Sequence, residues 1–235
     1  IRIQADGRYD LIAAKTGAVT SELHLPLPAG VTVAAIIKGP VLGGLVGVGL
    51  SNGEMLVVKP DYQSSFDDHN VRTTTAELKF PYGEKALRID AAGQPLQQFT
   101  LYGDDKKLIV LAHTAAGVEQ IKFSKPVQVS SESDGLSLDF ESEPVADAPA
   151  VVDAGLAETA RTLLPFNGTT VNAVVYGQDG VWGYVVHDDT QLAVYSLRGE
   201  PTLNQELRIT EPGVKVTAVN ALQGNISLLI GDSRG

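Results

Sequence analysis

The chain has 235 residues, of which 43% are hydrophobic and 20% are charged, and this is enough material to bury the core of one all-β domain. The formal net charge of −10 repels the phosphates of nucleic acids, so we expect no nucleic-acid partner. The absence of cysteine excludes disulfides, thiolate metal sites and cysteine nucleophiles.

We expect the chain to be a soluble module cut from a longer protein. It begins at Ile1, its only methionine is the internal Met55, and no signal-peptide pattern opens it. The most apolar stretch, 41–50, is interrupted by four glycines and is far shorter than the roughly 20 residues of a membrane-spanning helix. We expect residues 1–235 to form a single domain.

Taken in chain order, the first strands are predicted at 9–14 and 18–25, around a turn at 15–17, and they look like the back half of a repeat. The clearest complete copy follows, with strands at 31–37, 45–50 and 54–58. Its second turn contains Asn52-Gly53, and Asn-Gly between two β-rich runs is a strong signal for a type I′ hairpin.

The same layout recurs along the rest of the chain. A second copy has strands at 98–102, 108–111 and 118–123, and a third has strands at 171–176, 181–186 and 192–195. A truncated last copy has strands at 216–222 and 227–230. These repeats predict an all-β fold of β-propeller type, with antiparallel blades of three to four strands, and leave open whether the ring is complete.

Equivalent turns set the repeat length. We align Gly17, Gly53, Gly117, Thr190 and Gly235, which are separated by 36, 64, 73 and 45 residues. The first and last spacings fit the roughly 40 to 50 residues of a propeller blade, so the two long ones must contain insertions.

Two insertions are expected. Residues 60–70 are polar and favour a loop, followed by an exposed strand at 71–75. The second insertion, at about 124–166, is acidic and favours a solvated loop with a short hairpin at 136–140. Within it, Asp153 precedes an apolar stripe at Leu156, Ala160, Leu163 and Leu164, and this predicts one short helix capped by Asp153.

The histidines are the first candidates for chemistry. His113 and His187 are expected at equivalent strand ends, and His187 precedes Asp188-Asp189, so a metal or general-base role is conceivable. The simpler interpretation is that His and Asp near tight turns satisfy backbone donors. His69 beside Asp67-Asp68 and His24 at a strand end are weaker candidates.

The acidic pairs Asp104-Asp105 and Asp188-Asp189 lack the alternating acidic loop of a calcium hand, so turn chemistry explains them better. No nucleophile elbow, Walker loop or dinucleotide fingerprint occurs in the sequence. We therefore assign no catalytic, cofactor-binding or metal-binding residue.

The stretch Gly231-Asp232-Ser233-Arg234-Gly235, which follows the apolar run 216–219, resembles a WD40-type blade. The Gly-His and Trp-Asp pairs of true WD40 repeats are absent, and the single tryptophan, Trp182, lies elsewhere. Together with the acidic composition, this stretch is similar to the propeller-like extramembrane domain of the long phosphate ABC transporter permeases of the PstC type.

The resemblance implies a non-catalytic domain of a bacterial inner-membrane permease, on the periplasmic side, that contacts or regulates other transporter subunits. Phosphate recognition and ATP hydrolysis would belong to those subunits. Two alternatives remain open: a metal-dependent propeller hydrolase, and a stand-alone WD40-like scaffold.

Overall fold

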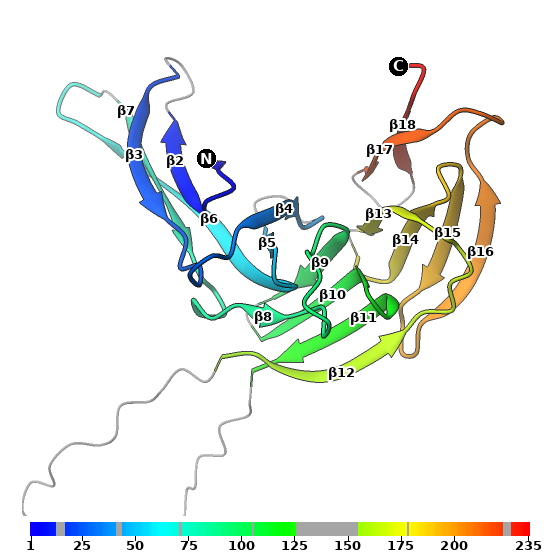
Figure 1. The fold of residues 1–235 in the computed structure, drawn as a ribbon. Coiled ribbons are helices and arrows are strands. Elements are labelled where there is room, and N and C mark those ends of the chain that lie inside the picture. Colours follow the sequence, from blue (N-terminus) through cyan, green and yellow to red (C-terminus); the bar gives the residue numbers. More distant parts are fainter. Residues whose placement is uncertain are drawn as a thin grey trace, which may run out of the picture.

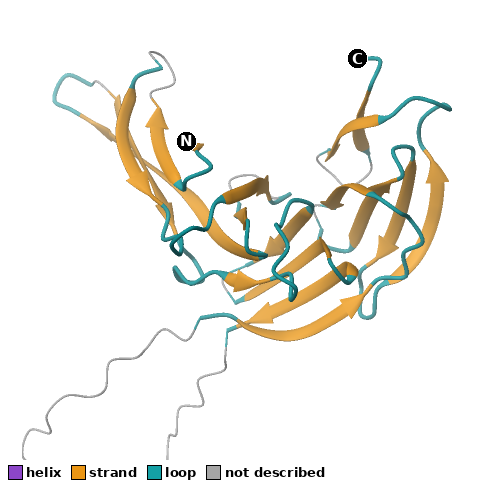
Figure 2. Ribbon diagram, viewed as in Figure 1, coloured by secondary structure: helices purple, strands orange, loops and turns teal. Residues whose placement is uncertain are grey.

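The structure is a computed structural model that describes residues 1–12, 17–40, 44–70, 72–104, 106–125, 155–177, 179–222 and 227–235. Strands, turns and loops make up all of these residues, without any helix (Figure 2). No helix in this part of the chain is long and apolar enough to cross a membrane. The prediction of an all-β fold is confirmed.

Three antiparallel sheets of four or five strands form the middle of the molecule. The first blade contains β4 (Val33–Lys38), β5 (Val46–Leu50), β6 (Glu54–Phe66), β7 (Arg72–Lys79) and β8 (Leu87–Arg88). The second contains β9 (Phe99–Gly103), β10 (Lys107–Thr114), β11 (Gly117–Ser124) and β12 (Ala157–Leu163). The third contains β13 (Val171–Tyr176), β14 (Trp182–His187), β15 (Gln191–Ser196) and β16 (Thr202–Arg208).

Smaller sheets flank these blades, and the five sheets follow one another in an open arc (Figure 1). The N-terminal sheet contains β1 (Arg2–Ile3), β2 (Arg8–Ile12) and β3 (Val19–His24). The C-terminal sheet contains β17 (Val216–Ala221) and β18 (Leu228–Asp232). The predicted strand pairs of all the repeats are therefore present.

The apolar cores lie between neighbouring blades, because each sheet buries residues on both faces. The core between the first and second blades includes Met55, Phe99 and Ile121. The core between the second and third includes Leu111 and Tyr195. Each inner blade thus depends on its two neighbours, as in repeat architectures generally.

The glycines of the apolar stretch 41–50 permit this close packing. A Cβ added to Gly49 would clash with the Leu96 carbonyl oxygen and lie 2.7 Å from the Phe99 ring. One added to Gly47 would lie 2.5 Å from the same ring. The strand β5 therefore needs glycine where the innermost strand of the next blade crosses it.

The short helix predicted after Asp153 is wrong. The apolar stripe after Asp153 is not helical, because β12 pairs along β11 and so takes its backbone hydrogen bonds from the sheet edge. Asp153 itself and the hairpin expected at 136–140 lie outside the described residues, as does most of the insertion expected at about 124–166.

The polar insertion at 60–70 is not a loop. It continues β6, whose first half pairs with β5 up to Val58 and whose second half pairs only with β7, from Lys59 to Phe66. The exposed strand expected at 71–75 is part of β7, although Val71 lies outside the described residues. Residues 59–79 thus form a hairpin, here called the arm, that leaves the first blade (Figure 1).

The turns also correct the repeat alignment. The residue that follows the outer strand of a blade donates its main-chain N–H to a carbonyl oxygen at the start of the preceding strand. Leu164 N donates to Val118 O at 2.8 Å, and Ile209 N donates to Thr190 O at 2.9 Å. The same bond joins Leu25 to Gly7 at 2.9 Å. Gly7, rather than Gly17, is therefore equivalent to the turns at Gly117 and Thr190.

The turn at Asn52-Gly53 also differs from its prediction. Only Gly53 has a positive φ, of 78°, whereas a type I′ turn needs positive φ at both central residues. The hairpin itself is present, with a three-residue loop in which Gly53 takes the left-handed conformation.

Candidate functional site

Polar contacts gather at one edge of each blade, where the turn between its second and third strands meets the loop leading into its first strand. We call this the turn edge. In the first blade, Ser51 N donates to Thr32 O at 2.9 Å, and Thr32 N donates to Ser51 Oγ at 3.0 Å. Ser233 and Lys215 repeat this pair in the C-terminal sheet, at 2.9 and 3.2 Å. A serine here ties the turn to the loop.

The same main-chain bond locates the equivalent residues in the other blades. His113 N donates to Gln98 O at 2.8 Å, and Asp188 N donates to Thr170 O at 3.0 Å. His113 is therefore equivalent to Asp188, so its expected equivalence with His187 is wrong by one residue. Because adjacent residues in a strand face opposite sides, the two histidines cannot form one site.

Asp188 takes the place of the serine in the third blade. Its Oδ1 accepts hydrogen bonds from Thr169 N at 3.0 Å, Thr169 Oγ1 at 2.6 Å and Thr170 N at 3.0 Å. Its Oδ2 lies 3.0 Å from His187 Nδ1. The Thr169 hydroxyl first, and then His187 and the Thr170 amide, hold the pKa of Asp188 well below its usual range.

Asp189 fixes the rest of this turn. The φ angles of Asp188 and Asp189 are 47° and 62°, the left-handed pair that a type I′ turn requires and that Asp tolerates. Asn172 Nδ2 donates to Asp189 Oδ1 at 2.8 Å, and Lys215 Nζ lies 2.8 Å from Oδ2. The Asp188-Asp189 pair is thus accounted for by turn chemistry, as expected from its sequence.

His187 is buried beneath this turn. Its Nε2 lies 2.9 Å from Glu206 Oε1, without the alignment of a hydrogen bond. Its ring meets Phe166 edge to face, with centroids 5.1 Å apart. With Asp188 on its other nitrogen, the His187 side chain is only 3% exposed and packs between the Asp188-Asp189 turn and the outer strand β16.

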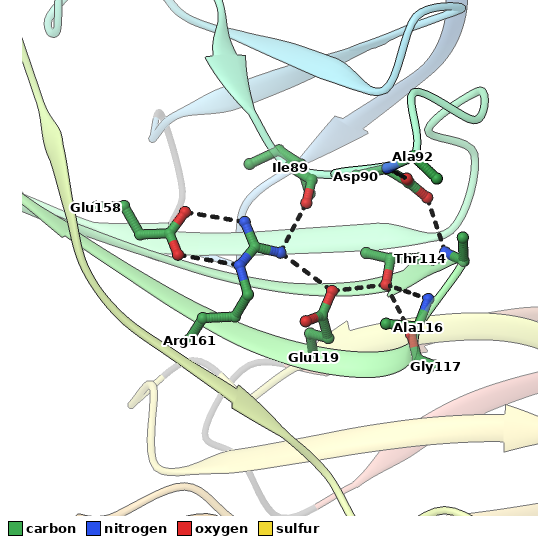
Figure 3. Close-up of polar contacts among 10 residues, drawn as sticks. Ile89, Asp90, Ala92, Thr114, Ala116, Gly117, Glu119, Glu158 and Arg161 are labelled. Atoms are coloured by element: carbon green, nitrogen blue, oxygen red, sulfur yellow. Dashed lines mark hydrogen bonds and ion pairs between the residues drawn. The ribbon is translucent and has the colours of Figure 1, made fainter.

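In the second blade, an arginine organises the turn edge (Figure 3). Arg161, on β12, donates from one terminal nitrogen to Ile89 O at 2.8 Å and to Glu119 Oε2 at 3.0 Å. It also forms a two-pronged ion pair with Glu158, at 3.0 and 2.9 Å. Thr114 Oγ1 donates to the same Glu119 oxygen at 2.6 Å. The hydrogen bond to Glu158, more than the charge of Glu119, raises the pKa of Arg161.

Asp90 completes this network from the loop before β9. Its Oδ2 accepts from Ala115 N at 2.8 Å and its Oδ1 from Ala92 N at 2.7 Å (Figure 3). The Asp90 side chain therefore joins the loop to the turn, as the Asp188 side chain does in the third blade. None of Asp90, Glu119 and Arg161 stood out in the sequence, because their partners are distant along the chain.

The remaining sequence candidates also have local roles. Asp104 Oδ1 accepts from Lys106 N at 2.8 Å and Lys107 N at 2.9 Å, and these two bonds lower the pKa of Asp104. His69 N donates to Asp67 Oδ1 at 2.9 Å at the tip of the arm. His24 lies exposed at the end of β3, and Asp105 lies outside the described residues.

The described residues contain no group of three or more His, Asp or Glu side chains that could hold a metal ion. Two shallow cavities occur among them. One, of 310 Å³, lies between the first and second blades and is lined by Tyr82, Lys85, Leu87, Phe123 and Leu156, among others. The other, of 220 Å³, lies among the innermost strands and is lined by Lys38, Thr100 and Tyr176, among others.

Large apolar side chains are exposed on the arm. Tyr62 and Phe66 are 61% and 65% exposed and share one face of β6, because they are four residues apart in a strand. Between them, Ser64 Oγ accepts from Arg72 Nε at 3.1 Å and lies 3.1 Å from Thr74 Oγ1. The alternation of these two aromatics within the polar run 60–70 is the signal that could have identified the arm.

No family model and no curated protein matches the chain. Among solved structures, the chain is similar to the β-propeller domain of Cps50 (Swd1) from Myceliophteria thermophila, with 14% identity over 91% of this chain and a TM-score of 0.50. It is also similar to a chain in the Mitotic Checkpoint Complex, with 14% identity over 96% of this chain and a TM-score of 0.48. It spans 56% and 52% of those chains. The antiparallel blades and the first likeness together show a β-propeller fold.

Proposed function

We propose that this chain is a non-catalytic, protein-binding propeller domain. The observation that carries the proposal is the arm, which presents Tyr62 and Phe66 to solvent on a hairpin that leaves the body of its blade. Exposed aromatics are enriched at the centres of protein interfaces, because they bury a large area at a small cost in conformational entropy. The conspicuous Asp and His side chains at the turn edge, by contrast, are engaged in holding turns and loops.

In its finer form, the proposal is that the domain belongs to a PstC-type phosphate ABC transporter permease of the bacterial inner membrane and lies on the periplasmic side. The support is the sequence resemblance and the net charge of −10. A negative field opposes phosphate binding but attracts a protein with a basic patch. The partner would then be another subunit of the transporter, such as its binding protein.

A photo-crosslinking experiment tests the interaction. A photoreactive amino acid replaces Phe66 in the full-length parent protein, and a matched control carries it at Gln63, which is exposed on the opposite face of the arm. We expect an adduct with a transporter subunit from position 66 and none from position 63. Equal adducts from both positions, or none from either, would contradict the assignment of this face as the interface.

A further inference from the structure

The sequence contains two Asn-Gly dipeptides, and the structure places them in different surroundings. They are Asn52-Gly53, in the second turn of the first blade, and Asn167-Gly168, in the loop between β12 and β13. Asparagine before glycine is chemically labile, because the main-chain nitrogen of the glycine can attack the side-chain amide and glycine has no side chain to obstruct the attack. The hydrogen bonds at each site therefore determine how readily the reaction occurs.

The first dipeptide is held by hydrogen bonds on both reacting groups. Asn52 Nδ2 donates to Glu54 Oε2 at 2.8 Å, and Asn52 Oδ1 accepts from Glu54 N at 3.2 Å. The attacking atom, Gly53 N, donates to Leu50 O at 3.2 Å. The main-chain carbonyl of Asn52 also accepts from Arg88 Nη1 at 2.8 Å. Attack on the Asn52 side chain thus requires that several hydrogen bonds break.

The second dipeptide has none of these restraints. Neither Asn167 nor Gly168 makes a hydrogen bond or an ion pair with any residue that the structure describes, and Asn167 is exposed. Gly168 is closely packed, because a Cβ added to it would lie 2.5 Å from the Phe166 ring and 2.6 Å from His187 Nδ1. Gly53 is packed as well, with three atoms at 3.0 Å from the position of its Cβ. The two sites therefore differ in hydrogen bonding rather than in the packing of the glycine.

We propose that Asn167 is a site of spontaneous deamidation in the folded chain. Gly168 N attacks Asn167 Cγ, a new C–N bond forms, the Cγ–Nδ2 bond breaks, and ammonia leaves with the proton of the Gly168 N–H. Water then opens the resulting cyclic succinimide at either carbonyl and gives aspartate or isoaspartate. Both products carry a carboxylate, and isoaspartate also lengthens the main chain by one methylene group. The reaction needs no partner protein, so it does not depend on the proposed function.

The site lies beside the hydrogen bonds that hold the turn edge of the third blade. Thr169 donates to Asp188 Oδ1 from its main-chain nitrogen at 3.0 Å and from its hydroxyl at 2.6 Å. Gly168 lies against the His187 ring without room for a Cβ. An extra main-chain atom at Asn167 displaces Gly168 and Thr169 relative to these partners. We therefore expect the isoaspartate form to have a weaker contact between Thr169 and Asp188.

Incubation of the purified chain in mildly alkaline buffer, followed by peptide mass spectrometry at intervals, tests the proposal. We expect Asn167 to deamidate at least about tenfold faster than Asn52, because one hydrogen bond shifts a local opening equilibrium about fivefold and more than one must break at Asn52. Transfer of a labelled methyl group by a protein isoaspartyl methyltransferase identifies the isoaspartate product. Equal rates at the two sites, or no product at Asn167 over a period in which the urea-unfolded chain reacts, would overturn the proposal.

Two controls test whether the hydrogen bonds cause the difference. In urea, the two sites should react at comparable rates, and a tenfold difference that persists in urea would mean that the neighbouring sequence alone selects Asn167. The variant Glu54→Ala removes the acceptor of Asn52 Nδ2, so deamidation at Asn52 should become about fivefold faster while the rate at Asn167 stays the same. An unchanged rate at Asn52 would contradict the protective role of these hydrogen bonds.

Hydrogen exchange tests the effect on the turn edge. The amides of Thr169 and Thr170 both donate to Asp188 Oδ1, and they should exchange faster in the isoaspartate form than in the variant Asn167→Gln kept under the same conditions. Equal exchange of these amides in the two samples would refute the expected weakening of the contact.

Discussion

Replacement of Arg161 by methionine should cause a large loss of stability. Met keeps the length and apolar stem of the side chain but leaves the Glu119 carboxylate, whose side chain is only 8% exposed, with the Thr114 hydroxyl as its partner. Removal of one partner of a fully buried ion pair costs about 3 to 5 kcal/mol. Because the Arg161 side chain is itself 25% exposed, we expect a loss of about 2 to 4 kcal/mol in the free energy of unfolding.

Urea denaturation followed by circular dichroism measures this loss. Glu158→Gln is the control, since the more exposed Glu158 contributes only about 0.2 to 1 kcal/mol. The double variant Arg161→Met with Glu119→Leu removes both charges, and its loss should be smaller than the sum of the single losses by about 1 to 3 kcal/mol. Losses for Arg161→Met and Glu158→Gln that agree within about 0.5 kcal/mol would refute the reasoning.

Three further predictions concern single residues. The substitution Asp188→Asn keeps the left-handed turn but removes the charge. Because folding lowers the pKa of Asp188, the wild type should be more stable than the variant at pH 7. Melting measured as a function of pH should show this advantage shrinking as the pH falls below about 4. Gly49→Ala should lower the free energy of unfolding by more than about 2 kcal/mol, because the new Cβ would clash with the Leu96 carbonyl oxygen. The control Gly83→Ala, which has open space around it, should lower it by only about 1 kcal/mol in the same denaturant unfolding assay. Tyr195→Phe should cost about 1 kcal/mol in the same assay, because the buried hydroxyl donates to a main-chain carbonyl at 3.0 Å, and a cost near zero would contradict that hydrogen bond.

Local signals were enough to predict most of the strands. The hairpins around Gly53 and Gly117 combine alternating apolar residues with a glycine turn, and both properties depend on near neighbours in sequence. The same is true of β13 to β15, where the turn at Asp188-Asp189 was correctly attributed to its own backbone chemistry.

Elements determined by distant partners were not predicted. An i, i+4 stripe indicated a helix in the region of Ala157–Leu163, but the open edge of β11 decides its structure. The two-residue strand β1 is too short to give a periodic signal, so the repeat was aligned on Gly17 instead of Gly7. In the arm, both faces are solvated, and the usual apolar alternation is reduced to two aromatics.

The polar networks depend even more on tertiary structure. Arg161 reaches Ile89 O, a partner that lies 72 positions away in the sequence and directly follows β8 of the first blade. The sequence instead draws attention to His113, His187 and the acidic pairs, and it offers no means of pairing Arg161 with Glu119. Only the folded sheet brings these side chains together.

The most direct test of the proposed accessory role is an uptake measurement in the parent organism. The coding segment for residues 1–235 is deleted in frame from the parent gene, and phosphate uptake is followed during phosphate limitation and after phosphate is restored. We predict that the membrane part is still made, but that uptake or its regulation changes. Uptake and regulation that both match the wild type would contradict a role of this domain in transport.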